Sequence, residues 1–338
     1  MGNTTMCSEC SSMPFNVTKY FKIPIYSIVV AAGLPLNCLA LWALVHQIKR
    51  SVVLSVYIMN LLLANVLQIL TLPFWMYYSY HNHHWGLGGV MCVVVGLAFR
   101  TNFYAKNNFL CLIAMERYIG IVHPLKFHKL QTTQGAIRMC IFTWLLVGTL
   151  CAIGIGLQVE GSKAECCLDA FPLNYVFFKV ATISFSFFIP LVLMGFFYFS
   201  ILFELRKVAS LERRVRRQIY GFVSLILASF FLLFIPFHVT SCYKYSFDIL
   251  KKNVVDCSFE ENMFIYSHVT VCLTTLGNIL DPLLYILILK DIRIELISLL
   301  SFRARKTEIL FTMEQQDLPP HTTTGQMQDQ TGTQEGIH

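Results

Sequence analysis

Three runs of apolar residues in this chain are each long enough to cross a lipid bilayer as a helix. They cover Ile23–Leu44, Ile137–Leu157 and Gln218–Val239, and each reaches roughly the 20 residues that the hydrocarbon core of a membrane requires. The composition agrees, because 56% of the 338 residues are hydrophobic and only 13% are charged, which is about half the charged fraction of an ordinary soluble domain. The sequence therefore predicts an all-α membrane protein.

Further apolar segments bring the expected number of membrane-spanning helices to seven. The expected ranges are 23–48, 54–80, 89–122, 134–157, 173–207, 213–247 and 260–288. We expect them to form a seven-transmembrane helix bundle over residues 23–288. An odd number of spans places the two chain ends on opposite sides of the membrane.

Basic clusters in alternate loops and in the tail set the expected orientation. They are Lys49–Arg50, Lys126–Lys129, Arg206–Lys207, Arg213–Arg217 and Arg303–Lys306. The positive-inside rule makes these segments cytoplasmic, so they need no nucleic-acid partner and are suited to anionic membrane lipid. We therefore expect a multi-pass protein of the cell membrane with an extracellular N-terminus.

The chain ends have their own expected roles. Residues 1–22 are polar and carry glycosylation sequons at Asn3 and Asn16, so we expect an extracellular segment. Residues 289–305 alternate charged and apolar side chains at helical spacing and predict an amphipathic helix on the inner leaflet. Residues 306–338 lack an apolar period and predict a disordered cytoplasmic tail whose hydroxyl groups accept phosphate.

Six of the twelve cysteines lie at or beyond the ends of the apolar segments, all on the expected extracellular side. They are Cys7, Cys10, Cys92, Cys166, Cys167 and Cys257. An even number of cysteines on one face suits the oxidising exterior of a cell, where disulfide bonds persist.

Polar residues and prolines recur inside the expected helices in a recognisable order. They are Gly33–Asn37, Asn60–Asn65, Leu72–Trp75, Glu116–Tyr118, Trp144, Pro190, Tyr198, Phe234–His238 and Asp281–Tyr285. With this pattern the chain resembles class A, rhodopsin-like G-protein-coupled receptors. The resemblance implies a receptor rather than an enzyme, with no cofactor. It also implies a heterotrimeric G protein as partner, with arrestin and a receptor kinase acting at the tail.

Three further segments are similar to a smaller subfamily, the proton-sensing and lysolipid-linked receptors. They are Gly33–Trp42, Cys167–Leu173 and Cys257–Phe264. Purinergic and lipid-type receptors are its neighbours and share the Asp-Pro-x-x-Tyr form of the seventh-helix motif. The resemblance implies a Cys92–Cys167 disulfide, for which Cys166 is the adjacent competitor. It further implies that Cys257 pairs with Cys7 or Cys10.

The resemblance also implies a conformational switch at the cytoplasmic end. Glu116 would hold Arg117 at rest by a charge-assisted pair, because Arg216 and Arg217 on the lower sixth helix offer no acid across the bundle. The full expected switch set is Glu116, Arg117, Tyr118, Tyr198, Phe234, Pro236, Asp281, Pro282 and Tyr285. Activation would bring Arg117 toward the two tyrosines Tyr198 and Tyr285. The sixth helix would then move outward and open a groove for a helix of the G protein.

The centre of the expected bundle departs from the family pattern. Receptors of this class hold a sodium ion between a carboxylate on the second helix, a small polar residue on the third and a residue on the seventh. The matching positions here are Asn65, Lys106 and Asp281. We expect the Lys106 ammonium to occupy the sodium position and to pair with Asp281, which predicts a receptor insensitive to sodium.

Proton sensing rests on acids and histidines that match only in part. The buried acids of the subfamily match at Asp281 but not at Asn65 or Val147. The histidines expected at the outer face are His81, His83, His84, His238 and His268. Imidazoles titrate near pH 6.5, so clustered histidines can shift a two-state equilibrium. A wet loop without a role is an equal interpretation of His81–His84.

The ligand pocket is expected between the outer halves of the third, fifth, sixth and seventh helices. Its expected residues are Phe99, Arg100, Phe103, Tyr104, Lys179, His238, Lys244 and His268. Three cations with aromatic walls suit an amphiphile with an anionic head, such as a lysophospholipid or an oxidised fatty acid. Lys179 and Lys244 are equally explained as interfacial lysines that extend toward water.

Other classes of protein are less consistent with the sequence. A transporter of the inverted-repeat kind would show corresponding segments in two halves, and no sustained repeat is present. A purinergic-type receptor for a nucleotide or lipid remains an alternative. A non-signalling scavenger receptor is a second one, because Asn65 and Lys106 alter the switch core, although the Glu116–Tyr118 motif argues against it.

Overall fold

The structure, a computed structural model, describes residues 13–47, 52–123, 132–159, 167, 173–207, 213–250 and 257–288. These residues all belong to one compact unit, residues 1–293. The expected amphipathic helix and tail (289–338), the sequon at Asn3, and the side chains of Arg216 and Arg217 lie outside the described part.

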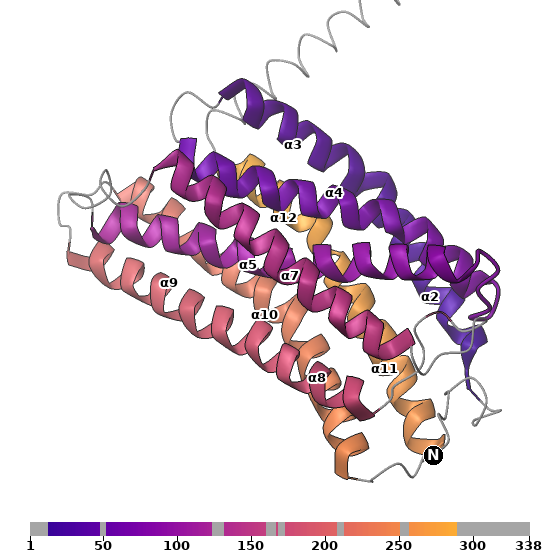
Figure 1. The fold of residues 1–338 in the computed structure, drawn as a ribbon. Coiled ribbons are helices and arrows are strands. Elements are labelled where there is room, and N and C mark those ends of the chain that lie inside the picture. Colours follow the sequence, from indigo (N-terminus) through magenta and orange to yellow (C-terminus); the bar gives the residue numbers. More distant parts are fainter. Residues whose placement is uncertain are drawn as a thin grey trace, which may run out of the picture. The chain divides into compact units, whose positions relative to one another are not determined.

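Helices account for all the regular secondary structure of the described residues (Figure 1). In chain order they are α2 (Phe15–Ile28), η1 (Val29–Gly33), α3 (Leu34–Gln47), α4 (Val52–Tyr80), α5 (Gly89–Val122), α7 (Thr133–Val159), α8 (Leu173–Ile183), η2 (Ser184–Phe188), α9 (Ile189–Lys207), α10 (Arg213–Leu250), α11 (Cys257–Thr275) and α12 (Gly277–Ile288). The segments η1 and η2 are single turns of π-helix inside otherwise continuous helices. The expected all-α bundle is confirmed.

The first helix begins at Phe15, eight residues before the expected start at residue 23, so the expected start of this helix is corrected. Its first turns stay helical because their polar side chains have protein neighbours. The Thr18 hydroxyl lies 3.0 Å from Nε2 of His83, and Lys22 is only 4% exposed. Asn16 lies on the exposed side of the same turn, where its amide oxygen accepts a hydrogen bond from Lys19.

Six helical rods in the described residues are long and apolar enough to cross a membrane. Five of the seven rods lie close to the expected ranges, and the rod formed by α11 and α12 begins at Cys257 rather than at residue 260. Large apolar side chains face outward on several rods, such as Phe196, Phe199 and Phe203 on α9. This pattern suits a helix whose outer face meets lipid tails.

The remaining rod, α5, is 34 residues long and carries polar side chains along its length. It packs against α4, α7 and α9, and Figure 1 shows it running among these helices. A helix surrounded by other helices does not need an apolar surface, because its polar groups find partners inside the bundle. The central position of α5 therefore allows it to bury Asn102, Lys106, Asn107 and Glu116.

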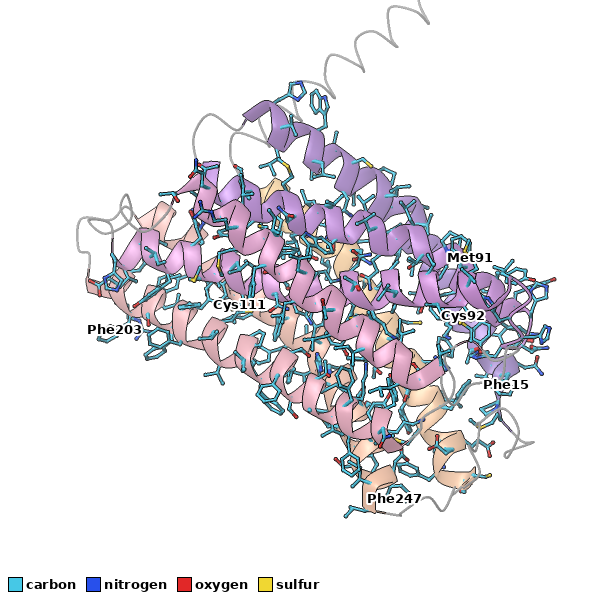
Figure 2. All side chains as sticks on the ribbon, in the orientation of Figure 1. Phe15, Met91, Cys92, Cys111, Phe203 and Phe247 are labelled. Atoms are coloured by element: carbon cyan, nitrogen blue, oxygen red, sulfur yellow. A yellow bond between two sulfur atoms is a disulfide. The ribbon has the colours of Figure 1, made fainter. Side chains whose placement is uncertain are left out.

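A disulfide bond between Cys92 and Cys167 attaches the chain after α7 to the start of α5. Cys92 and Phe15 lie at the same end of the bundle, which we call the outer end, and Phe203 lies at the opposite end (Figure 2). The predicted Cys92–Cys167 pair is thus confirmed over its competitor Cys166. Cys257 is also disulfide-bonded, and its predicted partners Cys7 and Cys10 lie outside the described residues.

Candidate ligand cavity, central polar site and switch

A cavity of about 220 Å³ opens among the helices near the outer end of the bundle. Seven of the eight residues expected at the ligand site line it, namely Phe99, Arg100, Phe103, Tyr104, Lys179, Lys244 and His268. They come from α5, α8, α10 and α11. The sequence pattern therefore located the cavity correctly, although it named only part of the lining.

One wall of the cavity carries two cations held by tyrosines. The ammonium of Lys179 donates a hydrogen bond of 2.8 Å to the Tyr104 hydroxyl. The guanidinium of Arg100 lies 5.9 Å from the ring centre of Tyr175. Within the described part of the chain, neither cation forms an ion pair with an aspartate or glutamate. This wall is a strongly positive surface that faces the cavity.

A second cationic wall includes a residue that the sequence analysis missed. Lys22 of α2 lines the cavity although it is 4% exposed, and it was overlooked because the first helix was expected to begin one residue later. Lys244 also lines the cavity and forms an ion pair of 2.8 Å with Glu260 of α11. Glu260 was missed too, because an acid at the start of an expected helix suggests solvent contact. Lys244 of the second wall is therefore paired with a carboxylate, whereas the cations of the first wall have no such partner among the described residues.

Aromatic rings form much of the remaining surface. Trp75 of α4 packs edge-on against Phe99 with 5.8 Å between the ring centres. Phe103 of α5 packs against Phe237 of α10 at 5.1 Å, and Phe264 of α11 lines the cavity near His268. Such rings provide apolar contact area for the hydrocarbon part of a ligand.

Of the five histidines expected at the outer face, the structure brings two together. The rings of His83 and His268 lie 5.2 Å apart, and both contact Phe264. His81 and His84 are exposed, and Nδ1 of His81 lies 2.9 Å from the Tyr77 carbonyl oxygen. The geometry therefore supports a histidine pair rather than a larger cluster.

His238 is placed differently from the expected ligand-binding position. It is only 1% exposed and is not among the residues that line the cavity. Its ring stacks on Phe187 of η2 with 4.1 Å between the centres. The assignment of His238 to the ligand site is therefore corrected. Its register on α10 turns it toward the π-helical turn rather than toward the cavity.

The central polar site is formed around Lys106, which is completely buried. Its ammonium donates hydrogen bonds to the amide oxygens of Gln68 at 3.3 Å and Asn278 at 3.1 Å. Asn65 instead donates to the Asp281 carboxylate at 3.2 Å. The expected direct pair between Lys106 and Asp281 is thus wrong. Asn278 lies one helical turn before Asp281 on the same face of α12. Its amide oxygen, rather than the Asp281 carboxylate, accepts the hydrogen bond from the ammonium.

An aromatic ring links this site to the cavity. The Lys106 ammonium lies 5.6 Å from the ring centre of Phe234 on α10, within the range of a cation–π contact. Phe234 also packs against Phe103, with 5.8 Å between the ring centres. Phe103 therefore lines the cavity on one side and contacts Phe234, which contacts the central cation.

The end of the bundle opposite the outer end has the arrangement expected for a resting switch. Nε of Arg117 lies 3.0 Å from Oε2 of Glu116, so the expected neighbouring ion pair is present. The Tyr118 hydroxyl lies 3.1 Å from Nε2 of His123. Tyr198 and Tyr285 are buried, and in the described part of the chain their hydroxyls have no hydrogen-bond partner. Both hydroxyls are thus available to a partner in a rearranged state.

Prolines occur in the helices that the switch is expected to move. Pro236 lies inside α10 and Pro282 inside α12, two residues after Phe234 and one after Asp281 respectively. A proline removes one backbone hydrogen bond and favours a bend at that point. These two prolines of the expected switch set therefore lie close in sequence to Phe234 and Asp281 of the central polar site.

Residues 36–285 match the sequence profile of the 7 transmembrane receptor (rhodopsin family). The match spans most of the chain, and the chain belongs to this family. It is accordingly a multi-pass membrane receptor that couples to G proteins, and not an enzyme.

Individual relatives agree with the expected region of the family. The chain is 28% identical over 297 residues to G-protein coupled receptor 68 of Mus musculus, covering 84% of this chain and 78% of the relative. It is 29% identical over 286 residues to the probable G-protein coupled receptor 132 of Mus musculus, covering 83% and 74%. It is 28% identical over 267 residues to the uracil nucleotide/cysteinyl leukotriene receptor of Homo sapiens, covering 78% and 72%.

Proposed function

We propose that this receptor responds to an amphiphile with an anionic head, such as a lysophospholipid or an oxidised fatty acid. The head group would lie between Arg100 and Lys179, and its signal would pass to a heterotrimeric G protein by outward movement of α10. The observation that carries the proposal is the pair of cations on one cavity wall that lacks an acidic partner among the described residues.

The free energy of burying charge supports an anionic ligand. A cation removed from water is costly unless a partner compensates it. Tyr104 and Tyr175 satisfy part of this requirement through a hydrogen bond and a ring contact, but neither supplies a negative charge. A carboxylate or phosphate can accept two hydrogen bonds from a guanidinium, with the ammonium as an additional donor. The aromatic lining then accommodates the apolar chain.

The contacts of Phe103 suggest how such a ligand acts on the switch. A ligand against Phe103 and Phe237 touches α5 and α10 at once, and Phe103 contacts Phe234 next to the hinge at Pro236. A ligand shifts the equilibrium only through different contacts in the two states. We therefore expect it to favour the packing in which α10 has moved outward.

The test is a second-messenger panel in cells that express the receptor, supplied with a library of lysolipids and oxidised fatty acids. Arg100→Gln and Lys179→Gln should each lower the potency of an active anionic lipid by about 10- to 100-fold, as expected for one lost hydrogen bond to a charged group. Lys19→Gln, on the first helix but outside the cavity lining, is the matched control. Potency that is unchanged in both cavity variants would overturn the proposal.

Proton sensing is a second candidate function, favoured by the contact of His83 with His268. Lys22 on α2 and Lys244 on α10 line the neighbouring cavity wall, and Glu260 on α11 forms an ion pair with Lys244. Protonating both rings would add positive charge beside two lysines, which a changed helix packing would relieve. The same panel should be run from pH 6 to 8 with His268→Phe as the variant. A flat pH response in cells that answer a lipid rejects proton sensing.

Two alternative functions can be tested with the same receptor-expressing cells and with purified G proteins. A purinergic-type receptor would answer uracil nucleotides in the panel, with a potency that again depends on Arg100. A scavenger receptor would bind lipid without agonist-dependent nucleotide exchange on purified G proteins. The extracellular N-terminus, the sequons at Asn3 and Asn16, and arrestin and kinase action at the tail belong to the proposal as well. Antibody access on intact cells tests the extracellular N-terminus, and glycosidase digestion tests the sequons. Agonist-dependent phosphorylation tests the action of the kinase and arrestin at the tail.

A further inference from the structure

We infer that Lys106 is a built-in cation that takes the place of the exchangeable sodium ion of this receptor class and contacts the moving helix α10 through Phe234. The inference does not depend on the identity of the ligand. It rests on the partners of the ammonium, on the space that the ammonium fills and on the charge that it brings.

The oxygen atoms of the site do not fit a sodium ion. Sodium would require several free oxygen ligands, but the amide oxygens of Gln68 and Asn278 both accept hydrogen bonds from the Lys106 ammonium. The Asp281 carboxylate accepts from the amide of Asn65, which also donates to Asn37. Asn65, at the helix α4 position where the class supplies a carboxylate, therefore brings two donated hydrogen bonds and one amide oxygen without a hydrogen-bond partner in the described part of the chain, but no negative charge.

The space at the site is filled by the lysine itself. Lys106 has no exposed surface. A methyl group placed on Gly277 of α12 would lie 3.4 Å from the ammonium nitrogen and 3.5 Å from Cδ1 of Leu233. The ammonium thus lies at ordinary contact distance from the position of a side chain on α12. A metal ion would have to displace it.

The charges at the site lead to the same conclusion. Lys106 supplies one positive charge, and Asp281 supplies one negative charge when it is ionised. The charges of the site therefore balance without an added ion, although the two groups do not contact each other directly. A second monovalent cation would meet the ammonium at short range in a medium of low dielectric constant, where repulsion is strong. Asn65 supplies no further negative charge to offset it.

The contact with Phe234 gives the built-in cation a role in switching. The ammonium touches α4 through Gln68, α12 through Asn278 and α10 through the ring of Phe234. A sodium ion can leave when such a site collapses, whereas a lysine ammonium remains attached to α5. Outward movement of α10 therefore has to break the cation–π contact, which opposes activation.

The first experiment measures the apparent melting temperature of the purified, full-length receptor in sodium chloride and in N-methyl-D-glucamine chloride at equal ionic strength. We expect the two values to agree within about 1 °C. A bound sodium ion would stabilise the folded protein by mass action and raise the value by several degrees. A rise of that size in the wild-type protein would overturn the inference.

The second experiment restores a sodium site. In Asn65→Asp with Lys106→Ser, two carboxylates face each other without an ammonium, and we expect sodium to raise the melting temperature. Asn65→Asp with Lys106 retained is the matched control, and we expect no sodium effect in it. An equal sodium response in both variants would show that the ammonium does not hold the position. If the double variant folds only at high sodium, that dependence agrees with the inference. If it does not fold at all, the effect of sodium on the melting temperature of the wild-type receptor decides whether the inference holds.

The third experiment addresses the contact with α10. Lys106→Met keeps the length of the side chain but removes the charge. We expect its basal nucleotide exchange on purified G protein, measured per folded receptor, to rise by about 2- to 30-fold, the range that a lost cation–π contact allows. Phe234→Leu should raise it similarly, and the combination should add little. Unchanged basal exchange in folded Lys106→Met would contradict the role in switching. None of these measurements needs an agonist, so they stand apart from the ligand proposal.

Discussion

The outer cavity and the central polar site both hold cations inside the bundle, but they treat them in different ways. Arg100 and Lys179 face a cavity and contact tyrosines, without an acid among the described residues. Lys106 is completely buried and has two amide oxygens and an aromatic ring around its ammonium. The first arrangement leaves a charge to be compensated from outside, and the second completes the compensation within the chain.

The difference teaches which buried cations point to a ligand. A positive side chain inside a membrane protein is expensive and is usually retained for function. The partners and the available space decide which function it serves. Where space adjoins the charge, an anion can enter, and where protein atoms surround the charge, the charge serves the packing of the helices.

The largest effect on stability should come from the central site. Lys106→Met leaves the oxygens of Gln68 and Asn278 without their donor and leaves Asp281 without a nearby positive charge. We expect a loss of about 2–4 kcal/mol, as for the removal of one partner from a buried charged network. The measurement is the apparent melting temperature in detergent, with Lys19→Met as the control. A variant as stable as the wild type would show that the ammonium is not held as described.

The ion pair in the outer cavity should show an intermediate effect. Lys244 and Glu260 lie 2.8 Å apart and are both buried. A double-mutant cycle with Lys244→Met and Glu260→Gln should give a coupling energy of about 1–2 kcal/mol. Lys19→Met combined with Glu260→Gln should give a value near zero. Coupling near zero in the first cycle would place Lys244 with Arg100 and Lys179, as a cation reserved for ligand.

Removing Arg100 from the first cavity wall should change stability less than removing Lys106 does. The change should also be in the opposite direction, toward a more stable protein. Arg100→Met removes a charge that lacks an acidic partner in the described part of the chain, so the free energy of unfolding should stay the same or rise, by about 1 kcal/mol at most. The same variant should lose lipid potency. A large loss of stability would mean that Arg100 has a structural partner, and it would remove the contrast between the two regions.

The smallest effect is expected from adding a methyl group beside the ammonium. Gly277→Ala places a Cβ at ordinary contact distance from Lys106 and Leu233 and lowers the entropy of the unfolded chain, so stability should change by less than about 1 kcal/mol. Gly33→Ala is a useful comparison, because its Cβ would come within 3.1 Å of Ile69. A greater loss for Gly277→Ala than for Gly33→Ala would indicate that the ammonium is packed more tightly than its distances suggest.

The helices and the cavity were predictable because their signals are repeated along the chain. The apolar segments along the chain predict all seven rods, and the spaced motifs around Glu116–Tyr118 and Asp281–Tyr285 give their register. The cavity residues on α5 follow from that register, since positions three and four residues apart share a helix face. These features do not depend on the conformation of any single side chain.

The partners of individual side chains could not be predicted in the same way, because they depend on side-chain conformation. A lysine has four side-chain torsions, so the position of Lys106 on its helix does not decide whether its ammonium reaches Asn278 or Asp281. Lys22 and Glu260 were missed because both lie where a helix was expected to begin, at the edge of water by the sequence alone. His238 was expected at the cavity because of the subfamily resemblance, whereas its register on α10 directs its ring onto Phe187 of η2.

That π-helical turn, η2, fixes the rotation of the outer part of its rod. A π turn holds one residue more than an α-helical turn would, so the residues before Ser184 are rotated by about 100° relative to an uninterrupted helix that ends at Lys207. Deleting one residue within Ser184–Phe188 would restore the α-helix and rotate α8 by that angle. Lys179 would then turn away from Tyr104, and the first cavity wall would lose one of its two cations with every cavity residue still present in the sequence. The one additional residue of this π turn thus helps to align the cavity wall that carries Arg100 and Lys179.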